Sequence, residues 1–118
     1  PVKFRNQVLI DGGAVNPVPF DLLPKDCDLT IAVDVIGDRT VSEKIPSLSE
    51  AVFNTYQIMQ KSIIREKLKT MTPDIYIEPN IVDVRVLAFY KAAEIFKQAA
   101  PIKRKLKQKI NQQLNKNK

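Results

Sequence analysis

The chain has 118 residues, 44% hydrophobic and 27% charged, a composition typical of one globular domain rather than of a disordered chain. One cysteine and no histidine exclude an internal disulfide framework and any Ser-His-Asp triad drawn from this chain alone. The net charge of +6 is concentrated in residues 102–118, which carry seven basic residues and no acidic one.

The first third of the chain predicts two strands separated by a long loop. Residues 7–10 are a short apolar run before two glycines, which indicates a buried strand that ends at a turn. Residues 11–19 contain two glycines and two prolines and are predicted to form a loop. One helical turn is expected at 20–23. Residues 29–35 are rich in β-branched side chains and apolar on both faces, as a central parallel strand requires.

Two helices and one more strand are predicted downstream. Ser47 and Glu50 fit a capping box that begins a helix, which we expect to end near Lys69. Its apolar residues recur at helical spacing: Leu48, Val52, Tyr56, Met59 and Ile63. Residues 74–78 alternate like a strand. A second helix, interrupted by Pro101, is indicated by a further apolar series: Val86, Phe89, Ala93, Phe96 and Ala100.

Strands that alternate with helices predict an α/β fold with a mostly parallel sheet. Three predicted strands make an incomplete sheet of this kind, and the chain begins with proline rather than methionine. We therefore interpret the chain as a piece of a larger protein, whose missing part would carry any targeting signal. Residues 1–101 are expected to form part of a domain, and residues 102–118 a basic amphipathic tail.

Asp11 is the leading candidate for a functional residue. In open α/β sheets, functional groups gather beyond the carboxyl ends of the strands, where Asp11 is expected to lie. Gly12 and Gly13 would permit positive φ angles or a close approach by another segment. An aspartate on a stiff loop suits a general base, although the same three residues also suit a simple turn.

A longer string of residues resembles the second signature of the patatin-like phospholipases. Residues 8–19 read VLIDGGAVNPVP, similar to the family's apolar strand, Asp-Gly-Gly and following Asn-Pro-x-Pro. Residues 28–35 (DLTIAVDV), 73–79 (PDIYIEP) and 89–94 (FYKAAE) resemble three later blocks of the family in the same order. The resemblance covers about residues 8–100.

This resemblance implies a three-layer α/β/α domain and a serine hydrolase that cleaves lipid or phospholipid esters through a Ser–Asp dyad, without a cofactor or metal. Asp11 would be the catalytic aspartate, and Gly12, Gly13 and Asn16 would belong to its loop. The family's Gly-x-Ser-x-Gly nucleophile and glycine-rich oxyanion loop are absent from this sequence. A missing amino-terminal segment or a companion chain would have to supply them, and this chain alone should be inactive.

The alternative hypothesis is a non-catalytic α/β fragment or scaffold. Ile102, Leu106, Ile110 and Leu114 form a narrow apolar stripe on a basic helix, which suits either an anionic membrane surface or packing on the domain itself. Nucleic acid is not expected as a partner, because residues 102–118 contain no aromatic side chain for stacking. The location would be cytoplasmic or at a membrane surface. Asp34 is interpreted as a structural hydrogen-bonding residue, and Cys27 as an inert thiol.

Overall fold

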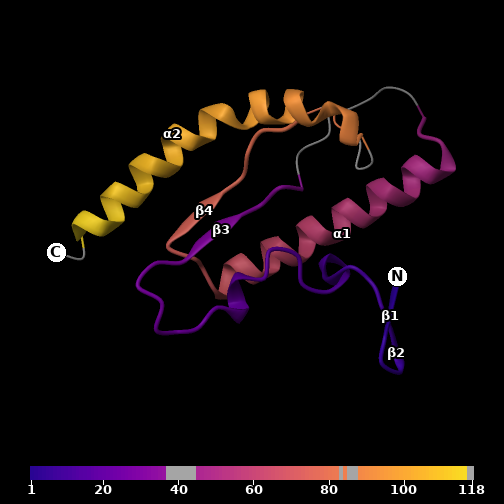
Figure 1. The fold of residues 1–118 in the computed structure, drawn as a ribbon, viewed down its shortest axis with the longest axis horizontal. Coiled ribbons are helices and arrows are strands. Elements are labelled where there is room, and N and C mark those ends of the chain that lie inside the picture. The colour runs from indigo at the N-terminus through magenta and orange to yellow at the C-terminus, as the bar shows by residue number, and fades with distance from the viewer. Residues whose placement is uncertain (37–44, 83, 85–87, 117–118) are drawn as a thin grey trace.

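The structure is a computed structural model of the chain, and it describes residues 1–36, 45–82, 84 and 88–116. Three short 3-10 turns are η1 (Gly12–Ala14), η2 (Phe20–Leu22) and η3 (Phe89–Lys91). The strands and helices are β1 (Val2–Phe4), β2 (Gln7–Leu9), β3 (Ile31–Val33), α1 (Leu48–Thr70), β4 (Ile75–Ile77) and α2 (Ala92–Lys116). The chain is therefore a mixed α/β protein (Figure 1).

Strands β3 and β4 form a parallel pair. Ile31 is opposite Ile75 in this register, and Val33 is opposite Ile77. Parallel neighbours need a long crossover connection, which α1 supplies. The predicted strands at 29–35 and 74–78 are confirmed with shorter bounds, and so is the helical turn expected at 20–23.

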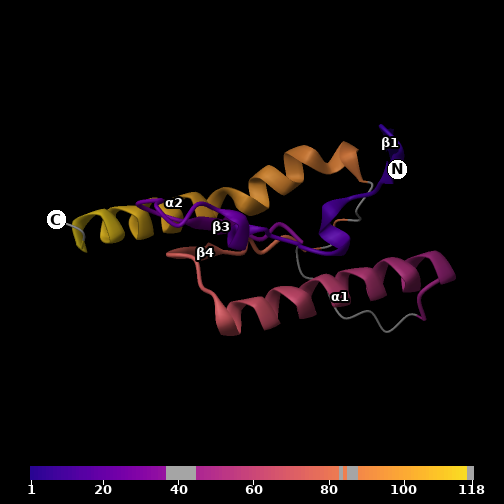
Figure 2. The ribbon, with the colours of Figure 1, turned by 90° about the horizontal axis from the view of Figure 1, so that it is seen from below.

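The parallel pair lies between the two long helices, as Figures 1 and 2 show. Few side chains of the described residues are buried, and most of them gather around this sheet. They are Phe20, Ala32, Asp34, Ile64, Ile75, Ile77 and Ala88, together with Pro17 and Pro79. The core is small for a chain of this length, because most of the apolar side chains of both helices lie elsewhere.

The ends of α1 follow the sequence signals closely. The Glu50 amide donates to Ser47 Oγ at 3.4 Å, and the Ser47 amide donates to Glu50 Oε2 at 3.0 Å, which completes the predicted capping box. The helix ends at Thr70, one residue beyond the predicted end, and Pro73 follows before the next strand. Lys67 and Lys69 in the last turn complement the negative end of the helix dipole.

The strand predicted at residues 7–10 is confirmed as β2 with shorter bounds, but the prediction that it is buried is wrong. β2 pairs with β1 as an antiparallel hairpin, and the chain reverses at Arg5, whose φ is 52°. The side chains of Val8 and Ile10 are each 70% exposed. A two-residue reversal brings the neighbouring strands together at once, whereas joining the parallel sheet needs a distant partner. Among the described residues the parallel sheet therefore has two strands, not three.

The prediction that Pro101 interrupts the second helix is also wrong, because α2 continues through it to Lys116. Proline removes one helical hydrogen bond and crowds the preceding turn. Packing of the following turns offsets this cost: Lys109 Nζ donates to the Tyr76 carbonyl at 3.4 Å, and Gln113 Nε2 donates to the Asp74 carbonyl at 3.3 Å. The basic segment, as far as residue 116, is thus the carboxyl-terminal half of one long helix.

The apolar faces predicted for the two helices are largely exposed. In α1, Leu48 is 84% and Val52 is 62% exposed, whereas the buried residue of this helix is Ile64. In the second helical segment, Phe89 is 79% and Phe96 is 74% exposed. Helical spacing identifies an apolar stripe but not the element that covers it. Within the described residues, nothing covers these two stripes fully. Val86 of the second series lies outside the described residues.

Candidate functional site

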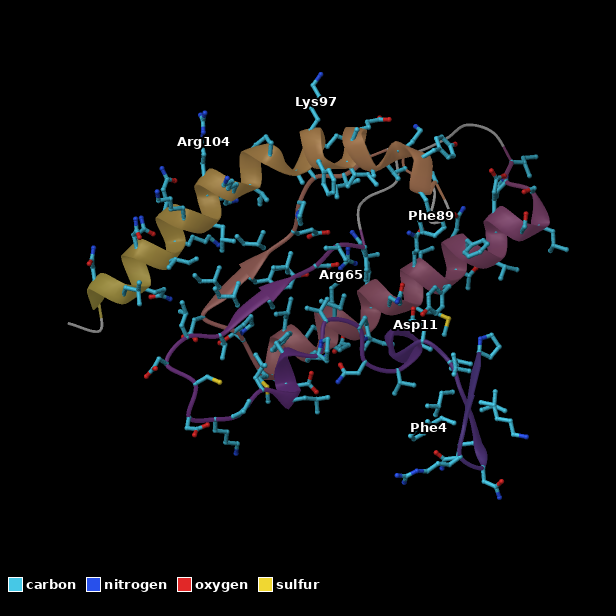
Figure 3. All side chains as sticks on the ribbon, in the orientation of Figure 1. Phe4, Asp11, Arg65, Phe89, Lys97 and Arg104 are labelled. Carbon is cyan, nitrogen blue, oxygen red and sulfur yellow. The ribbon has the colours of Figure 1, made fainter. Side chains whose placement is uncertain are left out.

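Asp11 lies between the hairpin and η1, on the outside of the molecule (Figure 3). Its Oδ1 atom accepts a hydrogen bond from the Gly13 amide at 2.8 Å, so its side chain caps the 3-10 turn. Its Oδ2 atom has no hydrogen-bond partner among the described residues. The carboxylate is therefore oriented by one short bond and keeps one oxygen free for another group.

Gly13 holds this loop close to α1. Gln60 Nε2 donates to the Gly13 carbonyl at 3.1 Å. A Cβ atom at residue 13 would lie 2.7 Å from that nitrogen and 3.4 Å from the Tyr56 hydroxyl. Neither Gly12 nor Gly13 has a left-handed φ, so close approach, not backbone freedom, explains the glycine at 13. At Gly12, a Cβ atom would meet nothing within 4 Å, which leaves open space beside Asp11.

Asn16 belongs to a polar cluster centred on Lys67. The Asn16 amide donates to both Asp21 carboxylate oxygens, at 3.2 and 3.1 Å, and its carbonyl oxygen accepts from Lys67 Nζ. Lys67 Nζ also donates to Asp21 Oδ1 at 2.7 Å and to the carbonyls of Pro17 and Val18 at 3.3 and 3.2 Å. The same ammonium lies 5.1 Å from the centre of the Phe20 ring, within cation–π range.

This cluster was not found by sequence reasoning. Lys67 is 46 residues from Asp21 along the chain, and a lysine near a helix end is usually a solvated residue. Its side chain is only 13% exposed here. The hydrogen bond from Lys67 is the main cause that lowers the pKa of Asp21 below its ordinary value. Asp21 therefore keeps its negative charge to a lower pH than an aspartate without this contact.

Lys67 also restrains an unusual backbone conformation. Val18 has a φ of 50°, which a β-branched residue rarely adopts. Such a conformation costs about 1–3 kcal/mol and persists only where the surroundings impose it. The Val18 carbonyl accepts from Lys67, and Pro17 beside it is buried. The loop after Asp11 is thus held in one shape by α1.

Asp34 has a structural role, as the sequence indicated. It is 2% exposed, its Oδ2 accepts from the Tyr76 hydroxyl at 2.7 Å, and its Oδ1 accepts from the Ile36 amide at 2.9 Å. Burial, followed by the hydrogen bond and the negative charge of Asp34, raises the pKa of Tyr76. None of these contacts involves the Asp11 loop, so the structure does not bring the two aspartates into one site.

The serines that the structure describes are engaged elsewhere. Ser47 caps α1 and lies 3.3 Å from the Ser49 hydroxyl, while Ser62 donates to the Ile58 carbonyl at 2.9 Å. Ser42 lies outside the described residues. Over the ranges that the structure describes, no three residues of the metal-ligating types are grouped to hold an ion. Cys27 is exposed.

The structure thus brings Asp11, Gly13 and Asn16 together on one face of α1, through Gln60 and Lys67. These two helical residues are seven positions apart, which places them two turns apart on the same side. Comparison of the chain with protein-family models, with curated proteins and with solved structures finds no match.

Proposed function

We propose that the chain is the carboxyl-terminal part of a patatin-like three-layer α/β/α domain and contributes the catalytic base of a lipid acyl hydrolase. The observation that carries the proposal is the Asp11 carboxylate, which is oriented by Gly13, has one free oxygen and borders open space at Gly12. A base must be fixed in direction and accessible to the proton that it removes. Asp11 meets both requirements.

The proposed reaction is a two-step acyl transfer. A serine from a companion segment attacks the ester carbonyl, and its proton passes to the free Oδ2 of Asp11. The proton then passes to the leaving alcohol as the acyl–serine ester forms. Water then attacks the acyl–serine ester and passes a proton to Asp11. Asp11 returns a proton to the serine as the carboxylic acid is released. Asn16 and Lys67 take no proton; they position the loop that carries the base.

The test is Asp11→Asn in the complete protein, assayed on a p-nitrophenyl ester and on a phospholipid. Asparagine keeps an oxygen that accepts from the Gly13 amide, so the turn is expected to survive while proton transfer is lost. We expect the hydrolysis rate to fall by roughly 10²–10⁴-fold, the usual contribution of a general base. Asp26→Asn, in an exposed loop, is the matched control and should leave the rate unchanged.

A rate retained by Asp11→Asn would remove this residue from the mechanism. The 118-residue chain without a companion segment should be inactive, because the proposed nucleophile is not part of it. Hydrolysis by this chain alone, after removal of contaminating esterases, would contradict the division of the dyad between two segments.

A second candidate function is a scaffold that binds an anionic membrane surface through residues 102–118. The half-buried side chains of Ile102, Leu106 and Ile110 lie on the side of α2 that packs against the sheet. Lys97 and Arg104 project away from the sheet (Figure 3). This orientation favours attraction by charge rather than insertion of the stripe. No helix among the described residues is long and apolar enough to span a bilayer. We propose a cytoplasmic location, or one at a membrane surface, together with these two candidate functions.

A further inference from the structure

Neither outer edge of the two-stranded parallel sheet has a strand partner among the described residues, but α2 donates hydrogen bonds to carbonyls on the β4 side, whereas the edge of β3 is open. The Asp34 amide donates to the Ile77 carbonyl at 2.8 Å, and the Thr30 carbonyl accepts from Ile75 at 3.0 Å. Successive residues of a strand turn their backbone groups to opposite edges. The amides of Ile31 and Val33 therefore point away from β4, and no described group accepts a hydrogen bond from them.

The cover of the sheet also stops at this strand. Ile75 and Ile77 of β4 are buried, at 1% and 3% exposure. Their neighbours on the same face of β3, Ile31 and Val33, are 36% and 44% exposed. Parallel sheets are normally covered on both faces, and two-stranded ones rarely stand alone. The side chains that would cover this face of the sheet are therefore missing over β3, next to the edge of the sheet that is away from β4.

The amount of exposed surface fits a large missing contact. The chain exposes 9862 Å². A folded monomer of 13.4 kDa is expected to expose about 6,500 Å², which leaves an excess of about 3,400 Å². Its radius of gyration is 16.9 Å, against about 13.5 Å expected for this length. A stable obligate interface hides roughly 1,000–2,500 Å² on each partner, so the excess is sufficient for one.

The chemistry of the edge identifies the kind of occupant. Exposed edge strands are usually protected by lysine, proline or a bulge, and β3 (Ile31–Val33) has only apolar residues. Its apolar character on both faces is that of a strand with parallel neighbours. A second copy that paired through the same edge across a two-fold axis would have to run antiparallel, and each copy carries a charge of +6. Both arguments favour a different segment over a second copy.

We propose that the free edge of β3 receives a parallel, predominantly apolar strand from a companion segment outside these 118 residues. The strand accepts hydrogen bonds from the amides of Ile31 and Val33, and the chain that follows it covers the exposed face of β3. That this companion also carries the nucleophilic serine rests on the proposed function. The docking of the strand does not.

Hydrogen exchange at two amides tests the proposal. The 118-residue chain is compared with the polypeptide that also contains the residues encoded directly before Pro1 in the same reading frame. We expect exchange at Ile31 and Val33 to slow by about 100-fold or more in the longer polypeptide, as hydrogen-bonded core strands do. Equal exchange rates in the two polypeptides would overturn the proposal. So would a dimer of the 118-residue chain in which these amides are already protected.

A substitution at the edge gives an independent measurement. Val33→Lys places a charge where the companion strand is proposed to pack, and it should lower the thermal midpoint of the longer polypeptide but not that of the 118-residue chain. Met71→Lys is the matched control, since Met71 has a similar exposure of 47% and lies between α1 and β4. Equal effects of both substitutions on the longer polypeptide would contradict the assignment of the edge.

The two proposals fail in different ways. Protected amides at Ile31 and Val33, combined with full ester hydrolysis by Asp11→Asn, would support the docking of a strand on β3 and contradict the catalytic role of Asp11. Loss of hydrolysis in Asp11→Asn, combined with unprotected amides at Ile31 and Val33, would support Asp11 as the base and contradict the docking of a strand on β3.

Discussion

The Lys67 ammonium lies 2.7 Å from the Asp21 carboxylate and joins the last turns of α1 to the loop that follows Asp11. The same ammonium donates to the Asn16 side chain and to two backbone carbonyls of that loop. The hydrogen bonds from this one side chain thus fix the loop, which is not held by strand pairing or by a long helix. The shape of the loop around Asp11 depends on this cation, although Lys67 itself is not expected to touch a substrate.

Lys67→Met is expected to loosen the loop while keeping the apolar stem of the side chain. Two backbone carbonyls, Asn16 and Asp21 lose their common donor, and the left-handed Val18 loses its restraint. The thermal midpoint should fall by about 5 °C or more, the size expected when a hydrogen-bonding partner is removed from a small domain. Lys69→Met is the control, because the Lys69 side chain is 67% exposed and its pair with Glu66 contributes little. Equal midpoints for the two variants would contradict the role of Lys67.

Alanine substitution at the two glycines should separate their roles. Gly13→Ala forces the Gln60 amide away from the Gly13 carbonyl and should cost about 1 kcal/mol, the value of one hydrogen bond. Gly12→Ala meets open space without a left-handed φ and should be neutral or stabilising by about 0.4–1 kcal/mol. In a Gln60→Ala background, the cost of Gly13→Ala should shrink. Urea unfolding of the four variants measures this, and a cost that is unchanged by Gln60→Ala would place the strain elsewhere.

Acid should destabilise the chain through two carboxylates. Hydrogen bonds lower the folded-state pKa of Asp21, through Lys67, and of Asp74, through the Thr30 hydroxyl and amide. A folded pKa below the unfolded one adds stability above the unfolded value of about 3.9, and this stability is lost as the pH falls through the folded pKa. The loss of unfolding free energy below about pH 4 should be smaller in Thr30→Val, which removes one donor to Asp74. Identical acid profiles would contradict this coupling.

The buried pair of Asp34 and Tyr76 should be sensitive to removal of one hydroxyl. Tyr76→Phe leaves Oδ2 of Asp34 without its donor, and a buried polar atom without a partner costs about 1–3 kcal/mol. The raised pKa of Tyr76 adds stability that is present below the unfolded value of about 10 and is lost above it. The variant should therefore lose less stability in alkali. Tyr90→Phe, at an 84% exposed residue, serves as the control.

The basic side of α2 should bind anionic vesicles if the second candidate function holds. Replacement of Lys97, Lys103, Arg104 and Lys107 by glutamine should weaken co-sedimentation with phosphatidylserine vesicles by up to about 1,000-fold, because each charge near the surface contributes about 1 kcal/mol. An equal removal of charge elsewhere, at Lys3, Arg5, Lys25 and Arg65, is the control. Equal weakening by both sets would indicate a general effect of net charge, and no binding by the wild type would dispose of the membrane role.

Sequence reasoning was most successful where structure depends on neighbouring residues. The capping box at Ser47, the end of α1 near Pro73 and the cores of both parallel strands follow from local signals. The expectation that Asp11 lies beyond the carboxyl end of a strand of the parallel sheet is wrong, because β2 belongs to the hairpin, but the turn directly after Asp11 is predicted correctly. In each case the residues that determine the outcome lie within a few positions of one another.

The remaining features depend on contacts between distant residues. The continuity of α2 through Pro101 is one of them, because the later turns of this helix contact β4 and the residue before it. The same holds for Lys67, whose partners are 46 to 51 residues away. The side of each helix that faces the sheet could not be predicted either, because the sequence reveals an apolar stripe but not the element that packs against it. The pairing of β2 is the exception, because its partner β1 is its neighbour in the sequence and residues 2–4 were not recognised as a strand.

The two contacts that fix the loop are made by Gln60 and Lys67, seven residues apart on α1. The number of residues between Gln60 and Lys67 sets the distance and the angle between their side chains, since each added residue advances the helix by 1.5 Å and rotates it by about 100°. One inserted residue between these positions would turn one contact away while the other stayed in place. Residues 61–66 can therefore vary in type at their exposed positions but not in number, and homologous chains should conserve this spacing even where they conserve no other residue of the helix.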